Sequence, residues 1–467
     1  MPDGSLVHLP TLPVAVIGAG PVGLAAAAHL RARGLTPLVL EAGPEVGAAV
    51  NAWGHVHMFT PWRFNIDGAA RMLLVAQGWT EPDADTFPTG AELASLYLAP
   101  LARALGGAVR TGAKVVGVSR RHHDLMRDTG RDAAPFVLHV AGPDGAVEEV
   151  EAAAVIDCSG TWDSPNPAGP HGLPALGEAV YSGRIAYGIP DVLGTERGTY
   201  AGRSVLVVGG GHSAMNVVLG LARLAQDAPG TRIAWALRKP LGAVRFGGGA
   251  NDGLLERGAL GARARALIED GAVRALAPFL IGSIEEEGGT LLVTGQEDGR
   301  ARQIRVDRMV VAAGFRPDLA PLRELRVALD SAVQAPPRLA PLIDPNVHSC
   351  GTVRPHGEAE LRHPEPGFYI AGMKSYGRAP TFLLATGHEQ VRSIAAALAG
   401  DWEAARDVRL ELPETGVCSG PGLAREVAEA CCTPATPQGA CCDVKPELAA
   451  AAPCCGPAPA RAASCCG

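Results

Sequence analysis

The chain has 467 residues, which is enough for about three domain-sized units. Its 48 acidic and 41 basic residues give a formal net charge of −7, so we expect no basic field for nucleic acid. Apolar residues make up 47% and charged residues 19%, which allows a large core. The start, MPDGSLVHLP, lacks the basic and apolar regions of a signal peptide. We therefore expect a soluble cytoplasmic protein without a membrane span.

The first predicted element is a strand over the apolar run Val14–Ile17. A glycine turn over residues 18–23 follows, then a helix over 24–33 and a strand over 37–40 that ends in Glu41. This order is typical of a dinucleotide-binding βαβ unit, whose glycines admit a pyrophosphate and whose acid accepts from a ribose hydroxyl. The cofactor-binding residues predicted here are Gly18, Gly20, Pro21, Gly23 and Glu41.

Between the first unit and residue 160, the pattern predicts both helices and strands. We predict a helix over Ala91–Leu105 and strands over Ala113–Val118, Phe136–Val140 and Val147–Ile156.

A second unit of the same kind begins at residue 204. It has a strand over Ser204–Val208, a glycine turn over 209–214, a helix through Ala225 and a strand over Ile233–Leu237. Arg238 and Lys239 stand where the first unit has Glu41, and two cations there suit the 2′-phosphate of NADPH. The residues predicted to bind NADPH are Gly209, Gly211, His212, Ser213, Ala214, Arg238 and Lys239.

Two such units in one chain suggest FAD and NADPH together. Residues 12–410 resemble the flavoproteins with two dinucleotide-binding domains, and within them the class B flavin-containing monooxygenases and N-hydroxylases. The resemblance implies an α/β fold with two Rossmann-like, doubly wound domains and a disordered C-terminal tail. The implied parts are an FAD domain in two pieces (1–164 and 306–410), an inserted NADPH domain (165–305) and a flexible tail (411–467).

The resemblance also assigns individual residues. Gly160 and Gly314 mark the crossings between the domains, and Gly372 marks the last FAD strand, followed by a helix over Thr386–Leu398. Val115 corresponds to the strand that reads the adenine through its backbone. Within the segment 51–65, which family members lay against the flavin ring, Trp62 is assigned to the pocket wall. Asn65 is the candidate catalytic residue.

Cysteine placement discriminates between reaction types. Residues 43–50 and all positions between Cys158 and Cys350 lack cysteine, so the redox disulfides of glutathione-reductase-like and thioredoxin-reductase-like enzymes have no counterpart. We therefore expect an NADPH-dependent FAD monooxygenase that uses O2 on a small soft or nucleophilic substrate, such as a thiol or metalloid; a homodimer is left open. Two departures from the monooxygenase pattern are Tyr187, where a histidine belongs, and Met373-Lys374, where an acid belongs.

The last segment carries eight of the 11 cysteines, in four adjacent pairs. Adjacent thiolates favour soft ions, and the pairs resemble the C-terminal cysteine pair of mercuric reductase. The monooxygenase-like family also occurs among arsenic-resistance genes. A metal or metalloid reductase or dithiol oxidoreductase, and a soft-metal-binding module with a redox-sensing body, remain alternatives. Zinc at His348, Cys350, His356 and His363 is not favoured, because their spacing matches no known site. The predicted soft-ion ligands are Cys431, Cys432, Cys441, Cys442, Cys454, Cys455, Cys465 and Cys466.

Overall fold

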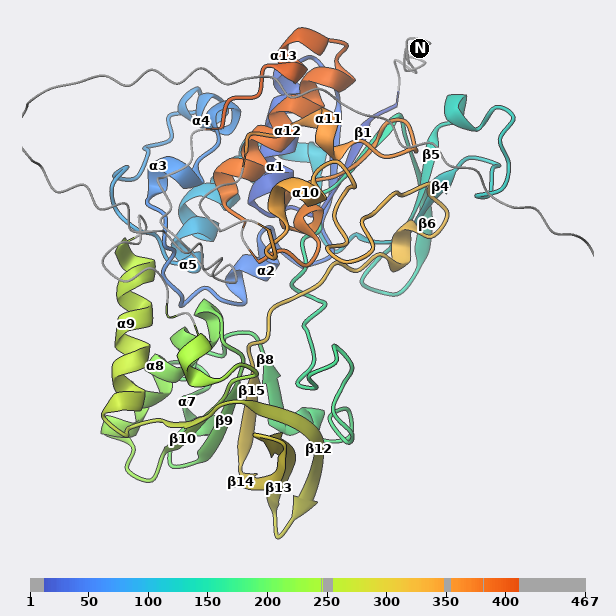
Figure 1. The fold of residues 1–467 in the computed structure, drawn as a ribbon. Coiled ribbons are helices and arrows are strands. Elements are labelled where there is room, and N and C mark those ends of the chain that lie inside the picture. The colour runs from blue at the N-terminus through green and yellow to red at the C-terminus, as the bar shows by residue number, and fades with distance from the viewer. Residues whose placement is uncertain (1–11, 245, 247–254, 348–353, 381, 411–467) are drawn as a thin grey trace, which may run out of the picture. The chain divides into compact units, whose positions relative to one another are not determined.

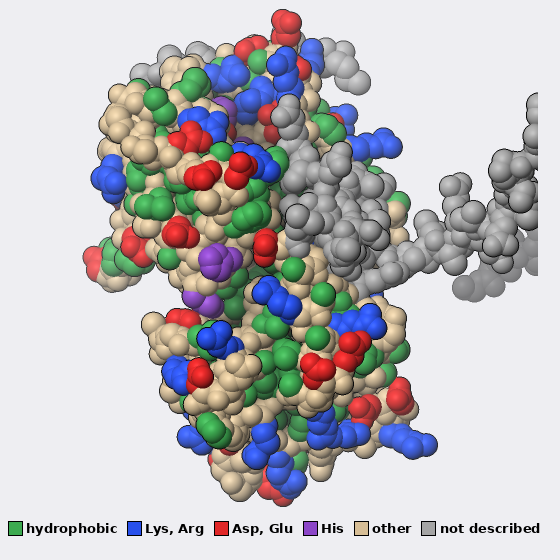
Figure 2. Space-filling view, turned by 90° about the vertical axis from the view of Figure 1, so that its left-hand side faces the viewer, with side chains coloured by type: hydrophobic (Ala, Val, Ile, Leu, Met, Phe, Trp, Pro, Cys, Tyr) green, Lys and Arg blue, Asp and Glu red, His purple; other side chains and the backbone are tan. Residues whose placement is uncertain are grey.

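The computed structural model describes residues 12–244, 246, 255–347, 354–380 and 382–410. The predictions for the tail and its cysteine pairs lie outside the described residues. None of the helices in these ranges is long and apolar enough to cross a membrane. On the face displayed in Figure 2, acidic and basic side chains are interspersed.

The first sheet is parallel and has the strand order β16-β7-β1-β2-β3. Its strands are β1 (Val14–Ile17), β2 (Pro37–Leu40), β3 (Val109–Arg110), β7 (Ala154–Asp157) and β16 (Phe368–Ile370). The chain leaves this sheet after β7 and returns to it only at β16, on the far side of β7 from β1. A long insertion therefore separates two neighbouring strands.

The two faces of the first sheet are covered differently. Val14 and Val16 pack against helices, whereas Ala15 and Ile17 pack against an antiparallel sheet, because alternate side chains of a strand point to opposite faces. The helices on the first face are α1 (Pro21–Ala32), α4 (Gly68–Val75), α6 (Ala99–Leu105) and α12 (Leu384–Leu398). The antiparallel sheet consists of β4 (Lys114–Arg120), β5 (Phe136–Ala141) and β6 (Val147–Ala152).

The insertion forms a second parallel sheet with the order β11-β10-β9-β15-β8. Its strands are β8 (Ile185–Tyr187), β9 (Ser204–Val208), β10 (Arg232–Ala236), β11 (Arg274–Leu276) and β15 (Arg308–Val311). Helices α8 (His212–Asp227) and α9 (Leu255–Glu269) lie together beside this sheet in Figure 1, packed against Val205 and Val207. The antiparallel strands β12 (Phe279–Glu287), β13 (Thr290–Glu297) and β14 (Arg300–Val306) contribute to the core on the other face.

The predicted fold class is confirmed as an α/β fold with two dinucleotide-binding domains, one inserted into the other. One detail differs from a doubly wound sheet, which carries helices on both faces. Here each parallel sheet has helices on one face and an antiparallel sheet on the other.

Three predicted segments differ in detail. The single strand over Val147–Ile156 is wrong: residues 147–152 pair with β5, and residues 154–157 pair with β1 in another sheet. The predicted helix over Ala91–Leu105 contains a π-helical stretch, Leu93–Leu98, before Pro100, which has no N–H to donate. β15 pairs with β9 and β8, so the second sheet extends past the expected boundary at residue 305.

Short elements complete the described fold. They are α2 (Ala48–Asn51), α3 (Trp62–Asn65), α5 (Gly90–Glu92), α7 (Arg197–Tyr200), α10 (Ala340–Ile343), α11 (Glu358–Leu361) and α13 (Trp402–Arg406), with 3₁₀ turns η2 (Gly106–Ala108), η3 (Arg131–Ala133), η4 (Ser182–Arg184), η5 (Leu241–Ala243), η7 (Ala320–Leu322) and η8 (Gly372–Tyr376).

Candidate active site

The first glycine turn joins β1 to α1 and is tightly enclosed on one side. Gly18 has a φ of +95°, and a Cβ there would lie 2.9 Å from the carbonyl oxygen of Cys158. A Cβ on Gly23 would collide with the carbonyl oxygen of Gly18. Both positions therefore require glycine for reasons internal to the protein.

Gly20 differs from the other two glycines of this turn. A Cβ on Gly20 would meet no atom within 4 Å, so packing does not explain the residue. Gly20 is the N-cap of α1, which begins with Pro21 and has no side-chain cap for its first N–H groups. Open space beside uncapped N–H donors is the arrangement that accepts a pyrophosphate. These residues fit the pyrophosphate of FAD.

The Glu41 carboxylate lies at the same edge of the sheet. Its Oε2 accepts from the Ala19 N–H at 2.6 Å and its Oε1 from the Gly43 N–H at 2.8 Å. Each oxygen keeps a further lone pair for a ribose hydroxyl. The Ala113 N–H donates to the Glu41 carbonyl, which brings the segment before Val115 to this carboxylate. Val115 itself is buried in β4, and its role toward adenine stays a prediction.

A buried ion pair lies where β7 and β16 end. The Lys374 ammonium is 2.6 Å from Asp157 Oδ2 and 3.0 Å from Ser159 Oγ. Asp157 Oδ1 also accepts from the N–H and the hydroxyl of Ser159. The charged side chains are only 3% and 2% exposed. Sequence reasoning noted the unusual Lys374 but missed this pair; a lysine inside an apolar segment was the available signal.

A second buried network holds Gly372. The Gly372 N–H donates to Gln390 Oε1 at 2.8 Å, and Gln390 Nε2 donates to Ser375 Oγ and His356 Nε2, each at 3.0 Å. Burial lowers the pKa of His356, which keeps its ring neutral and able to accept. Gly372 itself lies against Val22 of α1. The network thus fixes Gly372 beside the first glycine turn.

The second glycine turn, between β9 and α8, repeats the construction of the first. Gly209 has a φ of +129°, and a Cβ there would collide with the Ala312 carbonyl. Gly211, the N-cap of α8, has nothing within 4 Å of its Cβ position and α8 has no side-chain cap. His212 and Ser213 begin the helix, and Ala214 is buried. The turn fits the pyrophosphate of NADPH.

The remaining cofactor predictions fall on loops. Arg238 and Lys239 are exposed just beyond β10, and their contact with the 2′-phosphate stays a prediction. Gly160 and Gly314 have positive φ values of 71° and 85° in the two segments that connect the sheets. These segments pair directly, because the Asn166 N–H donates to the Gly314 carbonyl at 2.9 Å.

The segment 51–65 is held by hydrogen bonds and packing within the protein. The Asn65 side chain is fully buried, and its Nδ2 donates to the carbonyls of Thr60 and Pro61 while its Oδ1 accepts from the Thr60 hydroxyl. Trp62 is buried in the core beside the first sheet. Both side chains therefore shape this loop, and their contact with the flavin stays a prediction.

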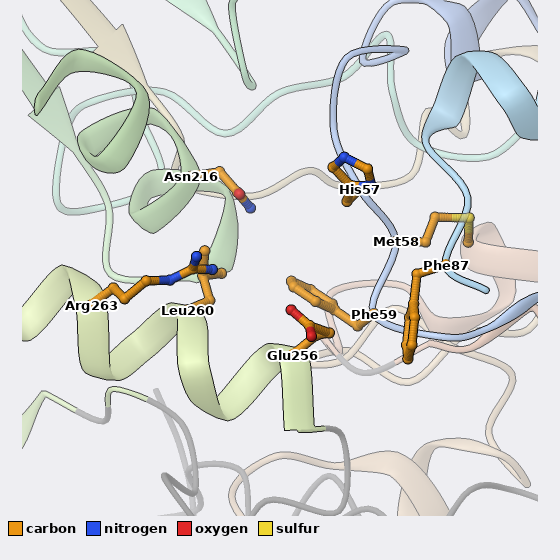
Figure 3. Close-up of a pocket in the computed structure, with 8 residues that line it drawn as sticks. All are labelled: His57, Met58, Phe59, Phe87, Asn216, Glu256, Leu260 and Arg263. Carbon is orange, nitrogen blue, oxygen red and sulfur yellow. The ribbon is translucent and has the colours of Figure 1, made fainter. Parts of the chain in front are cut away.

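A cavity of about 390 Å³ opens between this loop and the second sheet's helices. Apolar side chains supply much of its wall, and Asn216 and His57 add polar atoms (Figure 3). Phe59 packs edge-on against His212 at the start of α8, with ring centroids 5.4 Å apart. The cavity thus borders the second glycine turn. It is lined by His57, Met58, Phe59, Phe87, Asn216, Glu256, Leu260 and Arg263.

Among the described residues, the structure shows neither a cysteine pair nor a cluster of metal ligands. Cys158, a free thiol, is buried, and burial raises its pKa well above the usual range. No cluster of three potential metal ligands occurs among the described residues. The Nδ1 atoms of His356 and His363 bond the carbonyls of Arg354 and Ala328, and the other two members of the disfavoured zinc group lie outside the described residues.

The structure also gives a role to Tyr187, which stands where the monooxygenase pattern has a histidine. Its hydroxyl donates to the buried Glu178 carboxylate at 2.7 Å, and that carboxylate also accepts from the N–H groups of Ala168 and Ala175. Tyr187 therefore ties the connecting segment to the edge strand β8.

Two ferredoxin–NADP reductases are similar in sequence: that of Salinispora tropica is 28% identical over 68% of this chain and 78% of its own length. That of Paramagnetospirillum magneticum is 23% identical over 44% of this chain, and the match spans only 55% of the relative.

Solved structures share the fold. Bacillithiol disulfide reductase Bdr from Bacillus cereus has a TM-score of 0.61 at 20% identity, covering 83% of this chain and 99% of its own. The FAD-bound cadaverine monooxygenase DfoA from Erwinia amylovora has a TM-score of 0.58 at 14% identity, covering 88% and 99%.

The family model described as pyridine nucleotide-disulphide oxidoreductase matches residues 12–373, which include both glycine turns and Gly372. The chain belongs to the pyridine nucleotide-disulphide oxidoreductase family and is an oxidoreductase that depends on FAD and NADP(H).

Proposed function

We propose that the protein is an NADPH-dependent FAD monooxygenase that oxidises a small soft or nucleophilic substrate, such as a thiol or a metalloid species. The observation that carries the proposal is the cavity beside the second glycine turn, walled by Phe59 and by α8 and α9. A partly apolar cavity next to a cofactor site suits a small molecule. The fold shared with DfoA supports the reaction class.

The residues of the chain bind, orient and exclude water. The N-terminus of α1 with Gly20 holds the FAD pyrophosphate, and Glu41 accepts from its ribose. The N-terminus of α8 with Gly211 holds the NADPH pyrophosphate, while Arg238 and Lys239 contact the 2′-phosphate. Phe59 and the other apolar lining residues keep water from the substrate. When bound, the two cofactors supply hydride transfer and the electrons that activate oxygen.

Incubation with NADPH under ¹⁸O₂ tests the proposal directly. We expect one labelled oxygen atom in the product of a thiol or trivalent arsenical, with little hydrogen peroxide released. Phe59→Ala is expected to raise the peroxide formed per NADPH, because it opens the wall of the cavity. NADPH turnover that never places label in any product would overturn the proposal.

Electron delivery to an external acceptor is the second candidate. The sequence similarity to two ferredoxin–NADP reductases favours this candidate. Electron transfer to such an acceptor needs no oxygen. Anaerobic NADPH oxidation with ferredoxin as acceptor would select it over the monooxygenase.

The tail has a separate proposed role. We propose that the four cysteine pairs beyond residue 430 bind a soft ion, such as Hg(II) or trivalent arsenic, in the cytoplasm. In the reductase form of the second candidate, the acceptor is bound Hg(II), which takes two electrons from the flavin through a tail cysteine pair and becomes Hg(0). Loss of anaerobic Hg(II)-driven turnover on truncation after Val417 would support the reductase form; unchanged turnover would remove it.

A further inference from the structure

The cavity carries two opposite charges on one face of α9. Glu256 lies in the first turn of the helix, and Arg263 follows seven residues later. Residues at this spacing share a face, and the rise of an α-helix separates them by about 10 Å. Leu260, four residues after Glu256, lines the cavity between them.

Neither charge is used by the rest of the described protein. Glu256 and Arg263 have no hydrogen bond or ion pair with another described residue. By contrast, Arg265 on the same helix is paired with Glu269 at 2.7 Å. The charges facing the cavity are therefore available to a ligand.

The lining divides into two ends (Figure 3). Glu256 and Arg263 are two helical turns apart on α9, and Figure 3 shows Phe59 toward the Glu256 end and Leu260 toward the Arg263 end. A carboxylate attracts an ammonium group, and a guanidinium binds a carboxylate through two parallel hydrogen bonds. The apolar side chains between them suit a hydrocarbon segment.

We propose that the cavity selects a zwitterion, with its ammonium group at Glu256 and its carboxylate at Arg263. This inference rests on the proposed function, because it names the substrate class of the same site. Zwitterions whose ammonium and carboxylate lie about 10 Å apart, with a thiol or another soft atom between them, belong to this class, and the soft atom is the one that the proposed oxidation consumes. The two charges make Glu256 and Arg263 specificity-determining residues.

Binding of ω-aminooctanoate to the FAD-loaded full-length protein with NADP⁺ present tests the proposal by calorimetry. We expect Glu256→Gln and Arg263→Gln each to weaken the probe about tenfold, the effect of losing a charge-assisted hydrogen bond. Octylamine is expected to respond only to Glu256→Gln, and octanoate only to Arg263→Gln. Arg265→Gln is the matched control and is expected to leave all three affinities unchanged.

Exchanging the charges adds a second test. In the double variant Glu256→Arg/Arg263→Glu the probe is expected to bind again, because a linear zwitterion can turn around. The proposal would be overturned if neither single substitution changed the affinity for the probe. It would also be overturned if the wild-type protein did not bind the probe. Loss of NADP⁺ affinity in Arg263→Gln without loss of probe affinity would assign Arg263 to the cofactor instead. Because these are binding measurements, they are independent of the labelled-oxygen result.

Discussion

Replacing Lys374 by methionine is expected to destabilise the protein, because the substitution leaves the buried Asp157 carboxylate without its cation. Removing one partner of a buried pair costs about 3–5 kcal/mol. Asp157 Oδ1 would still accept from the N–H and the hydroxyl of Ser159, so only Oδ2 loses its partner. We therefore expect a loss near the lower limit, about 3 kcal/mol in the free energy of unfolding.

Denaturant unfolding of the FAD-loaded protein measures this loss. The double variant Asp157→Asn/Lys374→Met is expected to be more stable than Lys374→Met by about 1 kcal/mol or more, because it removes the unpaired carboxylate charge. Arg265→Met is the control: it breaks an exposed pair, 64% and 59% accessible, and is expected to cost less than about 1 kcal/mol. A Lys374→Met loss as small as the control's, or a double variant no more stable than the single one, would refute the reasoning.

Three further predictions concern the cofactor turns and pH. Gly20→Ala is expected to weaken FAD binding more than tenfold with little change in folding, whereas Gly23→Ala disrupts folding by its collision with Gly18; FAD titration and thermal unfolding distinguish the two. Arg238→Gln/Lys239→Gln is expected to raise KM for NADPH about tenfold or more but not for NADH, and equal effects on both would remove the 2′-phosphate role. Burial lowers the pKa of His363 from 6.5 to about 4. The neutral His363 ring therefore contributes about 3 kcal/mol to the free energy of unfolding above pH 6.5, and this contribution is lost as the pH falls toward 4. Urea unfolding of wild type and His363→Gln near pH 7 and near pH 5 checks this, since an unchanged pH dependence in the variant contradicts it.

Much of the fold follows from local patterns. The strands over 14–17, 37–40 and 204–208 match the structure, because a short continuous apolar run bounded by turn residues predicts a buried parallel strand. Prediction failed at 147–156, where one continuous run serves two sheets. Nothing in the local pattern distinguishes these pairings, since the partner strands are distant in the chain.

The sequence by itself determined the two dinucleotide turns, because a pyrophosphate site requires particular backbone conformations within a few residues. Only the tertiary structure decided which side chains meet across the chain. Lys374 reaches Asp157 over a separation of 217 residues because β16 lies beside β7 in the first sheet. The cavity likewise joins Phe59 to Glu256 and Arg263 through the packing of a loop against α8 and α9. Such contacts depend on strand order and helix packing, which the spacing of residues along the chain does not encode.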